Sequence, residues 1–264
     1  MTQSAMSGKG RKTVEPYELK EMLLTPNEGA RPGRKNEPEA VVIHWTANTS
    51  KGADAIANRN YFNNWQNHPQ HLASAHYIVD DKRVVRCVPE NEAAYHVGAN
   101  AYTDKAKAVF LGNPNYKTIG IEVCVNQDGD FSKTYRNAVL LTANILRRYG
   151  WGTDRLWRHY DITGKNCPAF FVKDVTAKVY GFKGADAGWE QFTWDVTMEL
   201  RKRAGEAVGL FKDVVYHWAK ESIERVAKEG LVKGDDKGCF RPDDPITRAE
   251  LAVVLDRLLT LIGR

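Results

Sequence analysis

The segment AVVIHWT, residues 40–46, decides how the first part of this chain folds. Its apolar run ends at His44 in a polar cluster, a pattern typical of a strand buried in a sheet. Further strand-like runs and helical patterns alternate along the chain after it. Strands interleaved with helices predict an α/β fold, in which a central mixed β-sheet is flanked by helices.

The neighbouring elements follow from hydrophobic periodicity and from turn residues. Residues 80–82 are expected to join two strands into a hairpin, and Ser132 is expected to cap a helix that Gly150 ends. Residues 1–35 are rich in charged residues, proline and glycine, and predict a tail and an entry loop. The expected strands span residues 74–80, 83–88, 117–125 and 156–159, and the expected helices span residues 54–67, 132–149 and 189–203.

A composition shift at residues 205–209 separates the main part of the chain from a C-terminal segment with a different hydrophobic pattern. We expect a helix over residues 215–229 and a second over residues 248–261. Thr247 and Glu250 have the spacing of a capping box at the start of the second helix. The segment therefore predicts a small all-α helical hairpin of about 55 residues, marginally stable on its own.

The expected domains are a polar tail (residues 1–14), a main domain (15–204) and the C-terminal hairpin domain (205–264).

Composition narrows the classes of protein. A hydrophobic content of 42% in 264 residues excludes a disordered chain. The net charge of +5 is mildly basic, which suits an anionic polymer such as a cell wall or nucleic acid and equally suits an ordinary solvated surface, and we expect no nucleic-acid partner. No apolar stretch approaches the roughly 20 residues of a membrane span, so we expect no membrane insertion. Residues 1–15 lack the apolar core of a secretory signal, which predicts synthesis in the cytoplasm.

The four cysteines are widely spread and form no CxxC pair, which argues against a disulfide framework. Cys87 and Cys124 lie in apolar runs, where a free cysteine behaves as a small buried hydrophobe.

A second segment, RHYDITGKNCP at residues 158–168, carries the candidate chemistry. His159 and Cys167 flank a glycine-containing loop that can bring both side chains to one point, and His44 ends another strand. Two imidazoles and one thiolate make a three-ligand zinc set whose fourth position stays open for water. The three residues predict one Zn²⁺ per chain, although each alone also fits a structural role.

Glu122 and Lys165 are the other candidates. Glu122 interrupts an apolar strand, where a carboxylate must be paired, functional or turned toward solvent. Lys165 lies two residues before Cys167 and would place a cation near the metal, able to stabilise an oxyanion. The alternative for Lys165 is an exposed loop lysine.

The motif order resembles one family. The motifs are VIHWT at 42–46, SAHY at 74–77, AYHVG at 94–98, IGIE at 119–122 and the His159-x5-Lys165-x-Cys167-Pro168 run. Together they resemble the zinc N-acetylmuramoyl-L-alanine amidases, among them phage endolysins, Bacillus prophage amidases and peptidoglycan-recognition proteins.

The resemblance covers residues 15–204. It implies a mixed sheet with zinc in a surface groove, and cleavage of the amide between N-acetylmuramic acid and L-alanine of peptidoglycan. It further implies roles for single residues: His44, His159 and Cys167 as zinc ligands, Glu122 as the catalytic glutamate, Lys165 as an assisting lysine and His96 as a substrate contact.

One position departs from the family pattern. Some phage members carry a catalytic tyrosine where this chain has Ala75. This chain therefore cannot use a mechanism that relies on that tyrosine, and we expect Glu122 to act as the main base. We expect the adjacent His76 to be a packing residue outside the metal set.

The C-terminal hairpin resembles an S-layer homology module. The matching positions include Phe211, Asp213, Trp218, Gly234, Phe240-Arg241-Pro242 and Ile246-Thr247-Arg248-Ala249-Glu250. The resemblance implies docking on a secondary cell-wall polymer, with Trp218, Arg248 and Glu250 as contacts. Trp218 can instead pack between helices, and Glu250 can simply cap. Such modules usually occur in tandem and one is evident here, so a homodimer would restore avidity.

These features predict a phage or prophage endolysin that lyses the cell wall after release through a holin pore. A bacterial autolysin and a non-catalytic peptidoglycan-binding protein are the alternatives. Loss of the zinc cysteine usually marks the binding proteins, whereas Cys167 is present. A zinc peptidase acting within the stem peptide fits the motif set less well, and the paired motifs of a zinc base deaminase are absent.

Overall fold

A computed structural model describes residues 17–64, 72–204, 210–214, 217–235 and 238–263. The predicted tail, Trp65 and the composition shift at residues 205–209 lie outside the described residues. The chain divides into two compact units, residues 1–197 and 198–264.

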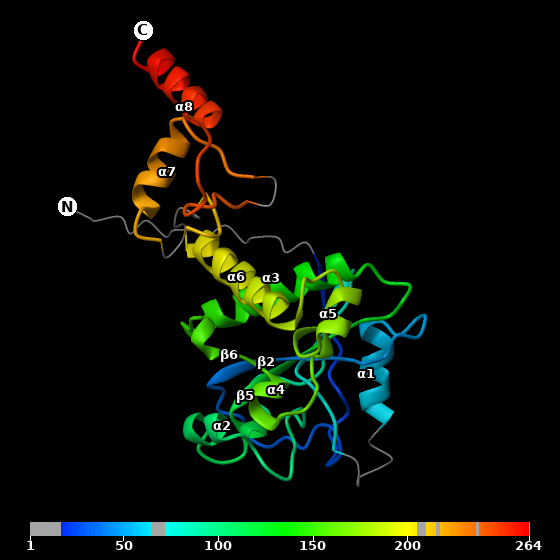
Figure 1. Ribbon diagram of the computed structural model, residues 1–264. Coiled ribbons are helices and arrows are strands. Elements are labelled where there is room, and N and C mark those ends of the chain that lie inside the picture. The colour runs from blue at the N-terminus through cyan, green and yellow to red at the C-terminus, as the bar shows by residue number, and fades with distance from the viewer. Residues whose placement is uncertain (1–16, 65–71, 205–209, 215–216, 236–237, 264) are drawn as a thin grey trace, which may run out of the picture. The chain divides into compact units, whose positions relative to one another are not determined.

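The first unit is built on a six-stranded sheet with the strand order β1-β4-β3-β5-β2-β6. Figure 1 labels β2, β5 and β6 of this sheet. β3 and β4 form the expected antiparallel hairpin, and every other pair of neighbours is parallel. The sheet is therefore mixed, and the predicted fold class is confirmed. The strands are β1 Glu18–Glu21, β2 Ala40–Trp45, β3 Tyr77–Val79, β4 Arg83–Arg86, β5 Thr118–Val123 and β6 Leu156–Arg158.

The helices of this unit are α1 Ala55–Asn64, α2 Asp104–Val109, α3 Phe131–Tyr149, α4 His159–Thr163, α5 Asp174–Val179 and α6 Ala185–Ala204. Three of them, α1, α3 and α6, were predicted from the sequence, and the short helices α2, α4 and α5 were not. The division between the two units falls inside α6.

Two expectations were wrong in detail. Part of the expected entry loop is strand β1, which pairs with β4 through backbone hydrogen bonds although three of its four side chains are exposed. The N-cap of α3 is Asp130 rather than Ser132: the Asp130 carboxylate accepts from Lys133 N–H and from the Ser132 hydroxyl. Gly150 ends α3 as expected, in the left-handed conformation with φ 69°.

The central strands are buried on both faces. Val41, Val42 and Ile43 of β2 have no exposed surface, nor have Ile119 and Ile121 of β5. α3 contacts β2, β3, β4 and β5 and covers one face. A parallel strand covered on both faces shows a continuous apolar run rather than alternation, which explains the sequence of β2.

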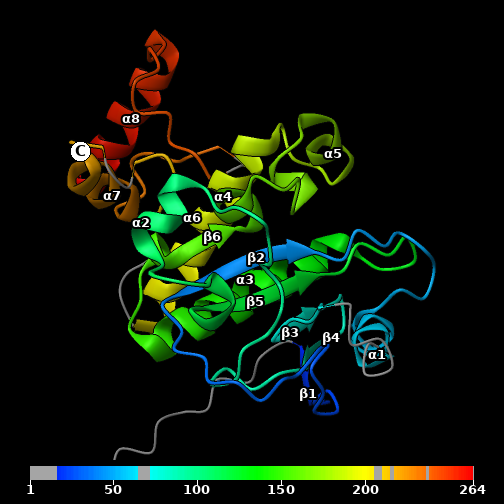
Figure 2. The ribbon, with the colours of Figure 1, turned by 90° about the horizontal axis from the view of Figure 1, so that it is seen from below.

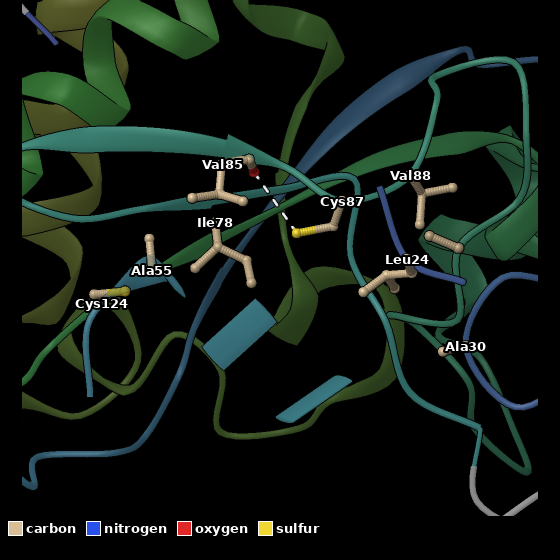
Figure 3. Close-up of a cluster of buried hydrophobic side chains, with 9 residues drawn as sticks. Leu24, Ala30, Ala55, Ile78, Val85, Cys87, Val88 and Cys124 are labelled. Carbon is tan, nitrogen blue, oxygen red and sulfur yellow. Dashed lines mark hydrogen bonds between the residues drawn. The ribbon is translucent and has the colours of Figure 1, made fainter. Parts of the chain in front are cut away.

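The other face is covered by two separate groups of helices. Figure 2 shows α1 beside β3 and β4, and α2 with α4 beside β2 and β6. Beneath α1 lies an apolar cluster that contains the free, buried thiols Cys87 and Cys124, as expected (Figure 3). A second cluster packs Phe110 of α2 and Ile162 of α4 against the sheet. Between the two groups the sheet face carries polar side chains.

The second unit contains α7 (Lys220–Lys228) and α8 (Arg248–Leu261). Its core is Phe211, Val214 and Ile223. Gly234 leaves room for this core, because a Cβ there would lie 2.5 Å from the Phe211 ring. α7 begins later than expected, at Lys220.

Hydrogen bonds to Asp213 and a capping box at the start of α8 stabilise the hairpin. Asp213 accepts hydrogen bonds from the backbone N–H groups of Phe240 and Arg241. The capping box of Thr247 and Glu250 forms as expected. α8 has no buried residue among those described.

In the described parts of both units, every helix is too short or too polar to cross a bilayer.

Candidate active site

A pocket of about 420 Å³ opens at the carboxyl ends of β2 and β5, where ligands of open α/β sheets commonly bind. α1 contributes Asn58, Tyr61 and Phe62 to one wall. The pocket also brings together all six residues predicted for the site: His44, His96, Glu122, His159, Lys165 and Cys167.

Strand pairing places His44 beside Glu122. The register of the parallel strands β2 and β5 pairs His44 with Glu122 and Val42 with Gly120. Residues paired in register project from the same face of a sheet. The imidazole and the carboxyl group therefore both enter the gap between the two groups of helices.

A short helix and its return loop position the other two candidate ligands. β6 pairs with β2 through Arg158 and Ile43, and His159 follows as the first residue of α4 rather than the last of a strand. Gly164, with φ 76°, ends α4 in the left-handed conformation. The loop then folds back, and Tyr160 N–H donates to the Cys167 carbonyl at 2.8 Å.

His44, His159 and Cys167 form one buried cluster whose candidate ligand atoms lie within 4.8 Å of one another. Nδ1 of His44 is 3.0 Å from Nδ1 of His159 and 3.7 Å from Sγ of Cys167. In a tetrahedral zinc site these N–N and N–S edges are about 3.3 Å and about 3.6 Å. The donor set and its spacing therefore fit zinc.

The protonation states of the two imidazoles suit metal binding. Burial, and then the neighbouring His159, hold the pKa of His44 well below its usual value. Burial, and then Lys165, lower the pKa of His159 to about 4. Both rings are therefore neutral near pH 7, the form that binds a metal.

Cys167 behaves differently, because burial and then Glu122 raise the pKa of its thiol. A metal ligand must be a thiolate, and the charge of a cation in the cluster deprotonates a coordinating thiol.

Glu122 is half-buried, and its Oε2 atom is turned away from solvent. Burial raises its pKa to about 8, and Lys165 is the group that opposes the rise. Its Oε2 atom has no hydrogen-bond partner in the described part of the chain. A carboxyl group poised near neutral pH inside a pocket is suited to general acid–base chemistry.

Lys165 is exposed, yet it lines the same pocket. Its charge lowers the pKa of both Glu122 and His159. Lys165 is thus an exposed loop lysine, as the alternative interpretation has it, and its charge also acts on the groups of the site.

His96 and His76 lie under the site. His96 is nearly buried, lines the pocket and contacts His44, with 2.9 Å between His96 Nδ1 and His44 Nε2. His76 is fully buried and pairs with backbone groups of Gly120 and Glu92, as expected for a packing residue. The sequence missed the contact between His96 and His44. The signal was Gly120, a small residue in a strand, which permits a close approach from another segment.

The predicted polymer contacts lie in the second unit. Trp218 is 91% exposed, so the interpretation as helix-packing core is wrong. Glu250 lines a groove of about 630 Å³ together with Arg241 and Arg257, and it also caps α8. Trp218 and Arg248 do not line that groove.

The family model described as N-acetylmuramoyl-L-alanine amidase matches residues 34–170, just over half of the chain, and the chain belongs to this family. The model of the S-layer homology domain matches residues 210–252. Both resemblances inferred from the sequence are confirmed.

Similar proteins are described as amidases of the same kind. A probable N-acetylmuramoyl-L-alanine amidase of Bacillus licheniformis is 40% identical over 153 residues, which are 56% of this chain and 42% of that protein. The amidase CwlL of the same species is 41% identical over 152 residues, 56% of this chain and 41% of that protein. The chain thus spans less than half the length of these relatives. The solved structure of a mutant endolysin from Bacillus subtilis is 29% identical, with a TM-score of 0.55 over 68% of this chain and 99% of that one.

Proposed function

We propose that this chain is a zinc-dependent amidase that hydrolyses the bond between N-acetylmuramic acid and L-alanine in peptidoglycan. The observation that carries the proposal is the placement of Glu122 beside the cluster of His44, His159 and Cys167 in one pocket. Family membership and the names of the relatives supply the bond that is cut.

His44, His159 and Cys167 would hold the zinc ion through two imidazole nitrogens and one sulfur. Bound there, zinc would polarise the scissile carbonyl and lower the pKa of a water molecule to about 7. Three protein ligands leave the fourth position for that chemistry, whereas a structural site is usually closed by four.

Glu122 would take a proton from the attacking water and then donate it to the leaving amine of L-alanine. A base that later serves as acid works best when its pKa lies near the working pH. Without metal, burial raises the pKa of Glu122 to about 8, and a bound cation would bring it back toward neutral pH. Ala75 is fully buried and carries no proton donor, so the carboxyl group has no tyrosine at that position to share the work.

Lys165 would stabilise the negative charge that develops on the carbonyl oxygen. Its side chain reaches the pocket that holds Glu122, His159 and Cys167, and a preorganised cation there favours the tetrahedral intermediate. Contact of His96 with the substrate stays a prediction.

The C-terminal unit would hold the enzyme on a secondary polymer of the cell wall, with Trp218, Arg248 and Glu250 as candidate contacts. Its match to the S-layer homology model and the exposure of Trp218 support this role. A homodimer stays a prediction. Residues 1–14 as a tail, 15–204 as the catalytic domain and 205–264 as the wall-binding domain form the proposed division.

A phage or prophage endolysin, released through a holin, is the proposed biological setting, supported by the similarity to a protein described as an endolysin. A bacterial autolysin is the second candidate, supported by the amidases of Bacillus licheniformis.

The proposal is tested by digesting purified peptidoglycan with the full chain and identifying the products by mass spectrometry. We expect stem peptides with a free L-alanine amino group, and their loss on chelation. Binding to peptidoglycan without any product would instead indicate a recognition protein.

A further inference from the structure

A line of three hydrogen bonds runs beneath the candidate metal site. The Thr118 hydroxyl lies 2.6 Å from the Pro114 carbonyl oxygen. His96 Nε2 lies 3.2 Å from the same hydroxyl. His96 Nδ1 lies 2.9 Å from His44 Nε2, and the other nitrogen of His44 faces His159 and Cys167.

The direction of each bond follows from which atoms carry protons. A carbonyl oxygen accepts only, so the single hydroxyl proton of Thr118 is donated to Pro114. The hydroxyl oxygen must then accept, which places a proton on Nε2 of His96. A neutral imidazole has one N–H, and the His96 ring is neutral because it is buried against the imidazoles of His44 and His76. Nδ1 of His96 is therefore an acceptor.

The last step concerns His44. Because His96 Nδ1 accepts, His44 Nε2 carries the proton and donates it. His44 is buried between the rings of His96 and His159 and is therefore neutral, so its Nδ1 holds a lone pair, and that atom is 3.0 Å from His159 Nδ1. The hydrogen-bond line thus selects the one tautomer of His44 that can bind a metal through Nδ1.

Packing leaves His96 little freedom to turn. Its ring lies directly on β5, where a Cβ on Gly120 would be 2.6 Å from His96 Cγ. Its backbone N–H and that of Val97 both donate to Asn115 Oδ1. The ring also meets those of His44 and His76 edge to face.

His159 lacks a comparable support. Its Nε2 atom is buried without a hydrogen-bond partner among the described residues. Among the described residues, a side chain holds the second nitrogen of His44 but not that of His159. His96 is therefore the residue that can orient a metal ligand from outside the cluster.

We propose that His96, held by Thr118 and Gly120, is a positioning residue that fixes the tautomer and orientation of His44 as a zinc ligand. This inference rests on the proposed zinc site and assigns His96 a role beyond contact with the substrate. Loss of such an outer hydrogen bond typically weakens metal binding about 10- to 100-fold.

The test measures zinc affinity of the full chain by competition with a chromophoric chelator. His96→Leu should weaken zinc binding about 10- to 100-fold. His96→Asn keeps an acceptor close to the position of Nδ1 and should retain most of the affinity. Thr118→Val, which removes the hydroxyl acceptor for His96 Nε2–H, should weaken binding in the same direction but less than His96→Leu, because the backbone carbonyl of Thr118 also accepts from the ring. Thr142→Val is the matched control, because Thr142 is fully buried in α3 and its hydroxyl has no partner in the described structure.

A second measurement does not depend on any variant. Long-range ¹H–¹⁵N correlation spectra of the metal-free wild type should show His44 and His96 as Nε2–H tautomers. An Nδ1–H tautomer of His44 would overturn the inference, as would a folded His96→Leu chain that binds zinc as tightly as the wild type. If the wild type itself binds no zinc, the proposed function fails instead.

Discussion

Glu122 lies in register with His44 across the parallel strands β2 and β5, so the candidate base and a candidate metal ligand project from the same face of the sheet. This relationship is set by backbone hydrogen bonds rather than by a loop. Sites built on strands hold their geometry more tightly than sites built on loops. The pairing also explains why the carboxyl group is shielded from solvent, since both strands have a neighbouring strand on each side.

Replacing Glu122 by glutamine tests its role as base. The amide keeps the volume of the side chain but cannot accept the proton of water. We expect hydrolysis of peptidoglycan to fall about 10²- to 10⁴-fold, with zinc binding retained. Glu190→Gln, at an exposed position of α6, is the control. Activity of Glu122→Gln close to that of the wild type would remove Glu122 from the mechanism.

The same variant tests burial of the carboxyl group through stability. The folded-state pKa of Glu122 is raised from 4.5 to about 8, so the wild type loses stability as pH rises from about 4.5 through about 8. The loss reaches at most about 5 kcal/mol. Glu122→Gln lacks it, so the variant should gain stability over the wild type between pH 5 and pH 9.

This comparison is made by urea unfolding with chelator present, because a bound cation would favour the carboxylate. A difference in unfolding free energy that stays constant across this pH range would contradict the burial of an ionisable Glu122.

Lys165→Met should shift the pH dependence of hydrolysis. Lys165 lowers the pKa of Glu122, so its removal raises that pKa and moves the rising limb of the kcat/KM profile to higher pH. The loss of a cation near the oxyanion should also reduce kcat. Lys178→Met, on the exposed surface of α5, provides the control. A limb that stays in place would separate Lys165 from Glu122.

Cys167→Ser tests the metal cluster. The substitution removes the thiolate that completes the three-ligand set, so the loss of zinc affinity should exceed the about 100-fold cost of losing an outer contact. Native mass spectrometry gives the zinc content of the folded chain. Cys239→Ser, in the second unit, should keep one zinc per chain. Full zinc occupancy in Cys167→Ser would place the metal elsewhere.

Trp218→Ala tests the C-terminal unit. Since Trp218 is 91% exposed, its removal should leave the fold intact. We expect weaker sedimentation with cell walls and unchanged hydrolysis of soluble muropeptides. Ile262→Ala, at another exposed apolar position, is the matched control. Unchanged wall binding in Trp218→Ala would exclude this residue as a polymer contact.

The sequence predicted the elements that carry a clear hydrophobic signal. β2 was found from its continuous apolar run, and α3 was found from the helical spacing of its apolar residues. β1 was missed because charged residues dominate it and backbone pairing with β4 holds it. α4 has five residues, too few for periodicity to detect. Asp130 and Ser132 are both capping residues, and only the structure decides between them.

The candidate site was predictable to a similar extent. His159 and Cys167 lie close in sequence, so a short return loop was enough to bring them together. The bond between His96 and His44 depends on where residues 94–98 cross β5, which Asn115 fixes from a distant segment. The burial of Glu122 likewise depends on the strands that flank it, which no local pattern reveals.

Identification of the bond that is cut tests the central claim most directly. Peptidoglycan of defined composition is incubated with the full chain, with and without chelator, and the products are analysed by mass spectrometry. The account predicts lactyl-bearing glycan strands and stem peptides with a new L-alanine amino terminus, abolished by chelation and restored by zinc. Cleavage within the stem peptide, or undiminished cleavage in the presence of chelator, would contradict it.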